Sequence, residues 1–146
     1  MDQWLPDELA LAGPEHVEAA AVARYEQKAA FDPEPDLALL RELGLGQESV
    51  VVDLGAGTGV FAFSVARFAG HVVAVDVSPA MVEAIRSKAV ANVEPVRAGF
   101  LTYDHAGNPA DVVYTRNALH HLPDFWKAIA LTRIASILKP GGLLRL

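Results

Sequence analysis

The chain has 146 residues, of which 52% are hydrophobic and 21% charged, and its formal net charge is −6. This length corresponds to one domain that can bury a substantial core. The acidic balance argues against a nucleic-acid partner, because binding to a phosphate backbone depends on clustered Lys and Arg. The sequence contains no cysteine, which excludes disulfides and zinc–thiolate sites and is consistent with a cytoplasmic protein.

No segment has the pattern of a signal peptide or a membrane span. The first residues lack a basic region followed by an apolar one. The most apolar run, from Val60 to Val75, is interrupted by Arg67 and His71. Such a run is too short and too polar to cross a bilayer, so we expect no membrane partner.

The first 45 residues contain two helical patterns. Pro14 begins an alanine-rich stretch that extends to about Ala30, and leucines at helical spacing from Asp36 to Leu43 predict a second helix that Gly44 ends. We interpret residues 1–45 as a helical lid segment, placed ahead of a core that residues 46–146 form.

Strand-like and helical patterns alternate after residue 46, which is typical of a parallel sheet covered by helices on both faces. The predicted strands are Val50–Asp53, His71–Asp76, Val93–Arg97, Asp111–Thr115 and Leu143–Leu146. The predicted helices are Val60–Ala69, a helix capped by Ser78 that runs from Pro79 to about Val90, and a helix from Pro123 that Lys139–Gly142 ends. Pro95 cannot donate to a ladder, so the third strand suits a sheet edge, and Gly99–Ala110 is predicted to be a loop.

Glycines follow the first predicted strand at Gly55, Gly57 and Gly59, and the apolar helical pattern begins at Val60. Glycine allows the backbone to turn tightly and to lie against a ligand, and the N-terminus of the following helix offers free N–H groups. Asp76 ends the second predicted strand, where a carboxylate is placed to accept hydrogen bonds from ribose hydroxyls. The alternative is that the glycines only form a tight turn, but Asp53 and Asp76 on either side favour a nucleoside-binding pocket.

The glycine spacing distinguishes between two kinds of nucleoside. A dinucleotide fingerprint reads G-x-G-x-x-G/A, and its third position falls on Val60, whose branched side chain is unsuitable for close packing. Here the spacing is G-x-G-x-G, which argues against a bound pyrophosphate. A nicotinamide-dependent oxidoreductase therefore stays open only as a weaker alternative.

Four motifs together resemble the class I S-adenosylmethionine-dependent methyltransferases, from about Val50 to the last residue. They are V-V-D-L-G-A-G-T-G at 51–59, V-V-A-V-D-V-S-P-A-M-V at 72–82, D-V-V-Y-T-R-N-A-L-H-H-L-P-D at 111–124, and L-K-P-G-G-L-L at 138–144. The resemblance implies a Rossmann-like, doubly wound α/β fold with strand order 3-2-1-4-5 and S-adenosylmethionine as cofactor. It says almost nothing about the methyl acceptor, which we expect to be a small molecule.

The resemblance also implies roles for single residues. Asp53 and Gly55 should line the amino-acid end of the cofactor, with Ala56 in the same loop, while Gly57 and Gly59 leave room for it. Asp76 should bind both ribose hydroxyls. Val77 and Met81 are candidates for the adenine face, although apolar residues there are as often plain core. Asn117 should lie beside the methionine portion, and Tyr25 could close over the cofactor carboxylate.

The chain departs from the family after the third strand. The family usually places there an acid that accepts from the exocyclic amine of adenine, whereas this sequence reads Arg97-Ala98-Gly99-Phe100-Leu101. The base could instead be read by backbone groups near Gly99 or stack on Phe100, and Asp104 is a distant substitute.

His121 is the candidate general base, with Tyr103 and His105 as weaker candidates and a structural, hydrogen-bonded histidine as the alternative. Adjacent histidines rarely hold one metal ion together, so we expect no metal site.

The sequence stops at the fifth predicted strand, whereas the sheet of the family continues into a helix and a hairpin. An uncovered edge strand invites pairing with another chain. We expect a truncated chain, or a homodimer through this edge, and an inactive binding fragment remains an alternative to an enzyme.

Overall fold

The computed structural model describes residues 4–14, 21, 24 and 31–146. The predicted helix between residues 14 and 30 falls mostly outside this set, as does Tyr25. In the described part of the chain, no helix combines the length and the apolar character that a membrane crossing requires.

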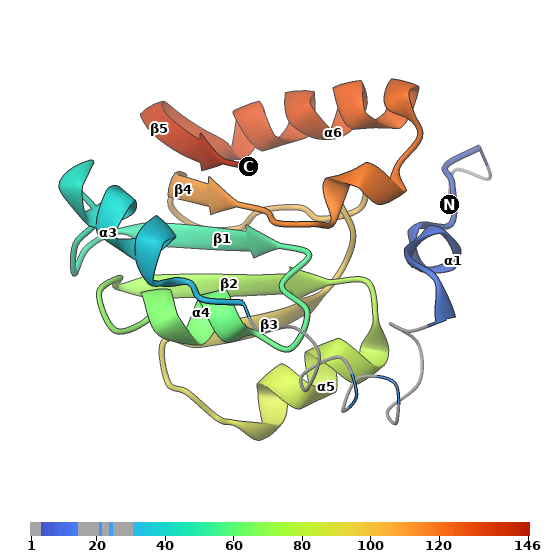
Figure 1. The fold of residues 1–146 in the computed structure, drawn as a ribbon. Helices are drawn as coiled ribbons and strands as arrows, with labels where there is room; N and C mark the ends of the chain where they lie inside the picture. The colour runs from blue at the N-terminus through green and yellow to red at the C-terminus, as the bar shows by residue number, and fades with distance from the viewer. Residues whose placement is uncertain (1–3, 15–20, 22–23, 25–30) are drawn as a thin grey trace.

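Five parallel strands form one sheet in the order β3-β2-β1-β4-β5, which confirms the predicted Rossmann-like topology (Figure 1). The strands are β1 (Val50–Leu54), β2 (His71–Asp76), β3 (Val93–Arg97), β4 (Ala110–Tyr114) and β5 (Leu138–Arg145). The helices are α1 (Glu8–Ala12), α3 (Glu34–Glu42), α4 (Val60–Val65), α5 (Pro79–Ser87) and α6 (Asp124–Ile137), with a 3₁₀ turn η2 at Leu119–His121. All five carboxyl ends point toward one edge of the sheet, where the connecting loops gather.

The central strands β1, β2 and β4 are buried on both faces of the sheet, since successive side chains of a strand point to opposite sides. In β1, Val51 packs in a cluster with Leu37 and Leu40 of α3 and with α4. Val52 and Leu54 of the same strand pack in a second cluster with α6. The short apolar runs of the sequence are therefore strands with two covered faces.

Several predicted boundaries are confirmed. Strands β2 and β3 have the predicted limits, and β3 with Pro95 lies at the edge of the sheet. Helix α5 begins at Pro79, and the buried Ser78 hydroxyl accepts a hydrogen bond from the Met81 N–H at 3.2 Å.

The predicted start of the fifth strand is wrong. Helix α6 ends at Ile137, and β5 already pairs with β4 at Leu138 rather than starting at Leu143. The segment Lys139–Gly142, predicted to end the helix, therefore lies within the strand as an irregularity in its register. Asp111 gives the physical reason: one of its carboxylate oxygens accepts from the Val50 N–H at 2.7 Å, and the other forms an ion pair with Lys139. The start of β5 is thereby held against β4 and β1.

Asp36 links α3 to the far edge of the sheet. Its carboxylate accepts from the Tyr114 hydroxyl at 2.8 Å and from the Arg145 guanidinium at 2.9 Å. Burial alone would raise the pKa of Asp36, but these two hydrogen bonds and the Arg145 charge outweigh it, and the pKa is lowered from its ordinary 3.8. The ionised form is therefore the one that stabilises the fold.

We expect Asp36→Asn to lower the free energy of unfolding by about 1.5–3 kcal/mol at pH 7, because the amide replaces a charged acceptor. Since the folded pKa is depressed, this contribution is present above the ordinary pKa and is lost as pH falls through the folded value. The difference between wild type and variant, measured by urea unfolding, should therefore shrink below about pH 4. Glu34→Gln, on the same helix but in an exposed ion pair with Arg67, serves as the control and should change stability by less than about 1 kcal/mol. A difference that is independent of pH would contradict the assignment.

Candidate functional site

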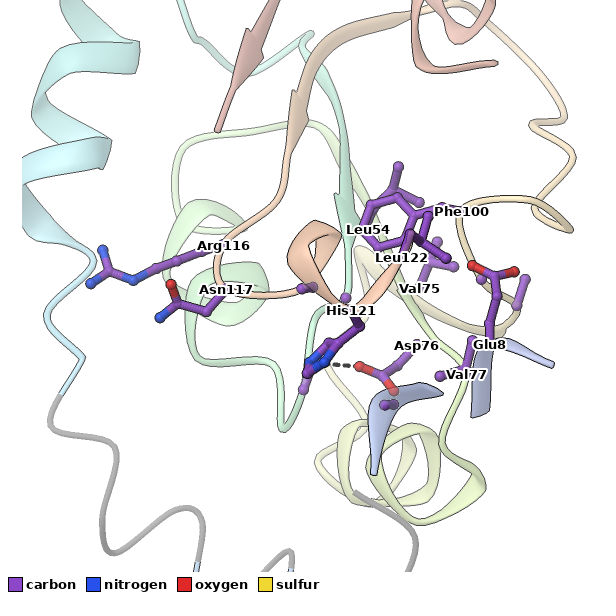
Figure 2. A pocket seen from close by; sticks show the side chains of 16 residues that line it. Glu8, Leu54, Val75, Asp76, Val77, Phe100, Arg116, Asn117, His121 and Leu122 are labelled. Atoms are coloured by element: carbon purple, nitrogen blue, oxygen red, sulfur yellow. Dashed lines mark hydrogen bonds between the residues drawn. The ribbon is translucent and has the colours of Figure 1, made fainter. Parts of the chain in front are cut away.

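A pocket opens at the carboxyl ends of the strands, where open α/β sheets bind ligands. Its walls come from the loops after four strands and from α1 (Figure 2). The lining residues are Glu8, Ala12, Leu54, Gly55, Gly57, Val75, Asp76, Val77, Ala98, Gly99, Phe100, Arg116, Asn117, Ala118, His121 and Leu122. In the view of Figure 2, Asn117 lies to the left and Glu8 with Phe100 to the right, with Asp76 and His121 between them.

The first loop needs its glycines for backbone conformation and for packing. Gly55, Gly57 and Gly59 have φ angles of 77°, 58° and 88°, a region that favours glycine. A Cβ on Gly55 would lie 2.4 Å from the Cβ of Ala118, so the loops after β1 and β4 touch at this point. Gly59 lies behind the pocket as the N-cap of α4, and a Cβ there would meet the Phe63 ring at 2.7 Å.

Asp76 lies at the tip of β2, with only 8% of its surface exposed, and it faces the glycine loop. One carboxylate oxygen accepts from the Gly57 N–H and the other from the Ser78 N–H, both at 2.9 Å. These two bonds fix the orientation of the carboxylate in the wall of the pocket. The geometry suits a ligand with two adjacent hydroxyls.

Asp53 is almost entirely buried in β1 and does not line the pocket. Burial raises its pKa well above the ordinary value, and the negative charge of Asp76 raises it further. Among the described residues, its Oδ2 atom has no hydrogen-bond partner. A buried acceptor in this state is expected to gain from a donor or a positive charge on a bound ligand.

The loop after β4 contributes Arg116, Asn117 and His121 to the pocket. Asn117 has a φ of 52°, which is uncommon outside glycine and is tolerated best by Asn and Asp. This turn directs the chain into η2, which carries His121. The Arg116 guanidinium lies over the Phe31 ring, 4.2 Å from its centroid.

Beyond Asp76, the pocket is lined by Val77, Ala98, Gly99 and Phe100, and Glu8 of α1 projects into this part. One oxygen of Glu8 accepts from the Leu101 N–H at 3.2 Å. Burial raises the pKa of Glu8, while the Leu101 and Phe100 backbone groups and the Arg133 charge oppose this rise without cancelling it.

The structure brings together most of the residues that the sequence suggested for binding, and it separates a few from the pocket. Lining it are Gly55, Gly57, Asp76, Val77, Gly99, Phe100, Asn117 and His121. Outside the lining are Asp53, Ala56, Gly59 and Met81. Met81 is fully buried in the packing of α5.

Tyr103 and His105 lie away from this pocket and line a separate depression with Arg133. There the Tyr103 hydroxyl and the His105 Nδ1 atom are 2.7 Å apart, and burial together with Glu94 raises the pKa of Tyr103 to about 12. Asp104 is paired with Arg133 in the same region. Tyr103, Asp104 and His105 thus lie outside the pocket at the carboxyl ends of the strands.

Sequence reasoning missed Glu8, Ala12 and Arg116. Arg116 adjoins Asn117 in the sequence and could have been found from that neighbour. Glu8 and Ala12 occupy positions i and i+4 of α1, which place them on one helix face, but nothing in the sequence indicates that this face meets a pocket. In the described ranges, no group of three His, Asp or Glu side chains could hold a metal ion.

Comparison with known proteins agrees with this geometry. Residues 51–142 match the family described as a methyltransferase domain. The sequence is 41% identical over 97 residues to a cypemycin N-terminal methyltransferase from Streptomyces sp., with 63% of this chain and 38% of that protein covered. The chain thus spans less than half the length of this curated relative.

Two solved structures share the fold. A putative methyltransferase from Haloferax volcanii, in complex with the Trm112 activator, has a TM-score of 0.73 and 26% identity, with 86% of this chain and 54% of that chain covered. The N-methyltransferase NodS from Bradyrhizobium japonicum, in complex with S-adenosylhomocysteine, has a TM-score of 0.64 and 21% identity, with 84% and 70% covered. With its family match over more than half its length, the chain belongs to the methyltransferase domain family.

Proposed function

We propose that this chain is the cofactor-binding core of an S-adenosylmethionine-dependent methyltransferase. The observation that carries the proposal is the Asp76 carboxylate, fixed by the Gly57 and Ser78 N–H groups and facing the glycine loop of the same pocket. A carboxylate in this position suits the two hydroxyls of a ribose. The family match and the S-adenosylhomocysteine found in NodS support the same ligand.

Other groups fit the remaining parts of this cofactor. Asp53 does not line the pocket, so its buried carboxyl group would support the positively charged amino end from beneath the first loop, which contains Ala56. Asn117 and Arg116 line the pocket on the β4 side, where a carboxylate end would find donors. Of the predicted lid, residues 1–45, the part that would cover the ligand is α1, which supplies Glu8 and Ala12 to the lining, whereas α3 packs in the core of the sheet.

When bound, S-adenosylmethionine supplies a methyl group on a sulfonium. Transfer of this methyl group to an acceptor atom would break the carbon–sulfur bond and leave its electron pair on sulfur. The chain contributes mainly alignment and exclusion of water. If the acceptor atom carries a proton, we propose that the half-buried His121 accepts it, because it is the imidazole that lines the pocket among the described residues.

The test is calorimetric binding of S-adenosylmethionine, S-adenosylhomocysteine and NAD to the same preparation. We expect both sulfur compounds to bind in the micromolar range or tighter, and NAD to bind much more weakly. The glycine spacing predicts this order because Val60 stands where a dinucleotide site needs a small residue. Binding of NAD alone would overturn the proposal.

For the acceptor, we propose a small molecule, since the acidic chain offers little to a phosphate backbone. One similar protein is named an N-terminal methyltransferase and another an N-methyltransferase, so a panel of amines is the first choice. Transfer is followed as S-adenosylhomocysteine formed per acceptor, with Asp76→Ala as the comparison.

A homodimer through the edge strand β5, proposed from the sequence, is tested separately by sedimentation.

A further inference from the structure

Glu8 is an acid from the first described helix that reaches a loop 93 residues later in the chain. Its Oε2 atom accepts from the Leu101 N–H, while its Oε1 atom is buried and has no hydrogen-bond partner in the described part of the chain. Leaving a buried acceptor unpaired is unfavourable, and such a group in a native structure calls for an explanation. A donor on a bound ligand would provide it.

The walls around this carboxylate indicate which donor would fit. Val77, Ala98 and Phe100 form apolar surfaces, and Gly99 has no side chain. A Cβ on Gly99 would lie 2.2–2.5 Å from the Glu8 carboxylate group, so the glycine leaves room for the carboxylate to enter. Figure 2 shows Glu8 turned toward this apolar part of the pocket, next to Phe100. A flat heteroaromatic ring with one polar N–H group at its edge matches such a surface.

In the described part of the chain, the two other acids near this wall do not supply such an acceptor. Asp104, the nearest acid in the sequence after β3, is almost fully exposed and paired with Arg133. Asp76 is held by the Gly57 and Ser78 N–H groups at the position expected for the sugar. Among the described residues, the carboxylate available to a base in this part of the pocket is therefore that of Glu8.

We propose that Glu8 determines the specificity for the base of the cofactor, by accepting a hydrogen bond from the exocyclic amine of adenine. The proposal rests on the proposed function, because it is the Asp76 site that would place the nucleoside in this pocket. Glu8 of α1 would thus supply the acceptor for adenine that the segment after β3 lacks, since Phe100 cannot accept a hydrogen bond.

The experiment compares two ligands by calorimetry on the full chain. One is S-adenosylhomocysteine, and the other is its deamino analogue, in which hydrogen replaces the exocyclic amine. We expect wild type to prefer the amine-bearing ligand by about 10-fold or more, the range of a hydrogen bond to a charged acceptor. Glu8→Ala should bind the amine-bearing ligand about 10-fold more weakly and lose the preference.

The matched control is Glu42→Ala, which removes an exposed glutamate from α3 and should keep the wild-type preference. Equal binding of both ligands by wild type would overturn the role of Glu8 without any variant, even if Glu8→Ala folded poorly. Unchanged or tighter binding by Glu8→Ala would also overturn it, and tighter binding would mean that the carboxylate competes with the base for the Leu101 N–H. In these cases the proposed function stands, whereas failure of wild type to bind either ligand contradicts both proposals.

Discussion

Asp76→Ala is expected to weaken binding of S-adenosylmethionine roughly 100-fold or more. Two hydrogen bonds from hydroxyls to a charged acceptor contribute about 1.5–3 kcal/mol each, and about 1.4 kcal/mol corresponds to a factor of ten in affinity. The carboxylate also orients the first loop through the Gly57 N–H, so its removal loosens the loop that faces the ligand. Isothermal titration of wild type and variant measures the loss.

A matched control separates the loss of the ligand-binding carboxylate from the general effect of removing an acidic side chain. Glu83→Ala removes an exposed carboxylate from the helix that follows Asp76, where it pairs only with Arg86 across one turn. Its affinity should equal that of wild type within about two-fold, since such exposed pairs contribute little. A cofactor analogue without the ribose hydroxyls should lose much less affinity on the Asp76→Ala substitution than S-adenosylmethionine does, because only the effect on the first loop remains. Affinity for S-adenosylmethionine that survives the loss of Asp76 would exclude a nucleoside at this position.

The sheet and the first loop could be predicted from local patterns because the determining interactions are short-range. Strand β2 is an apolar run with a glycine before it and a capped helix after it, and Ser78 with Pro79 specifies where that helix starts. Parallel order then brings the ends of β1 and β2 to one edge of the sheet. The proximity of Asp76 to the glycine loop follows from this strand order.

The features that local patterns could not predict depend on contacts between distant parts of the chain. Pro140, Gly141 and Gly142 suggest a loop, yet the pairing of Lys139 with Asp111 holds this stretch in β5. Glu8 belongs to a helix of five residues, which is too short to be stable alone, and only its packing brings it into the pocket. Likewise, the path of the loop that contains Tyr103 decides that its hydroxyl faces away from the site.

The contact between Gly55 and Ala118 predicts the largest effect of a small substitution. Gly55→Ala has to adopt a φ of 77° and brings a methyl group to 2.4 Å from the Ala118 Cβ. The left-handed conformation is unfavourable by about 1–2 kcal/mol, and an overlap in a packed region adds about 1–3 kcal/mol. We expect the free energy of unfolding to fall by the sum of these terms. Ligand affinity should fall as well, because the loops after β1 and β4 are pushed apart.

A double-mutant cycle with Ala118→Gly separates the steric overlap from the left-handed backbone conformation as causes of the destabilisation. Removing the Ala118 methyl group should recover the steric part of the loss, about 1–3 kcal/mol, and leave the conformational part. Gly107→Ala measures the conformational part by itself, since Gly107 has a φ of 89° and a Cβ there would meet no atom within 4 Å. If Gly55→Ala and Gly107→Ala destabilise the protein equally, or if Ala118→Gly rescues nothing, the two loops are not in the contact described. Recovery of both stability and affinity in the double variant would mean that this contact sets the width of the pocket between the loops after β1 and β4.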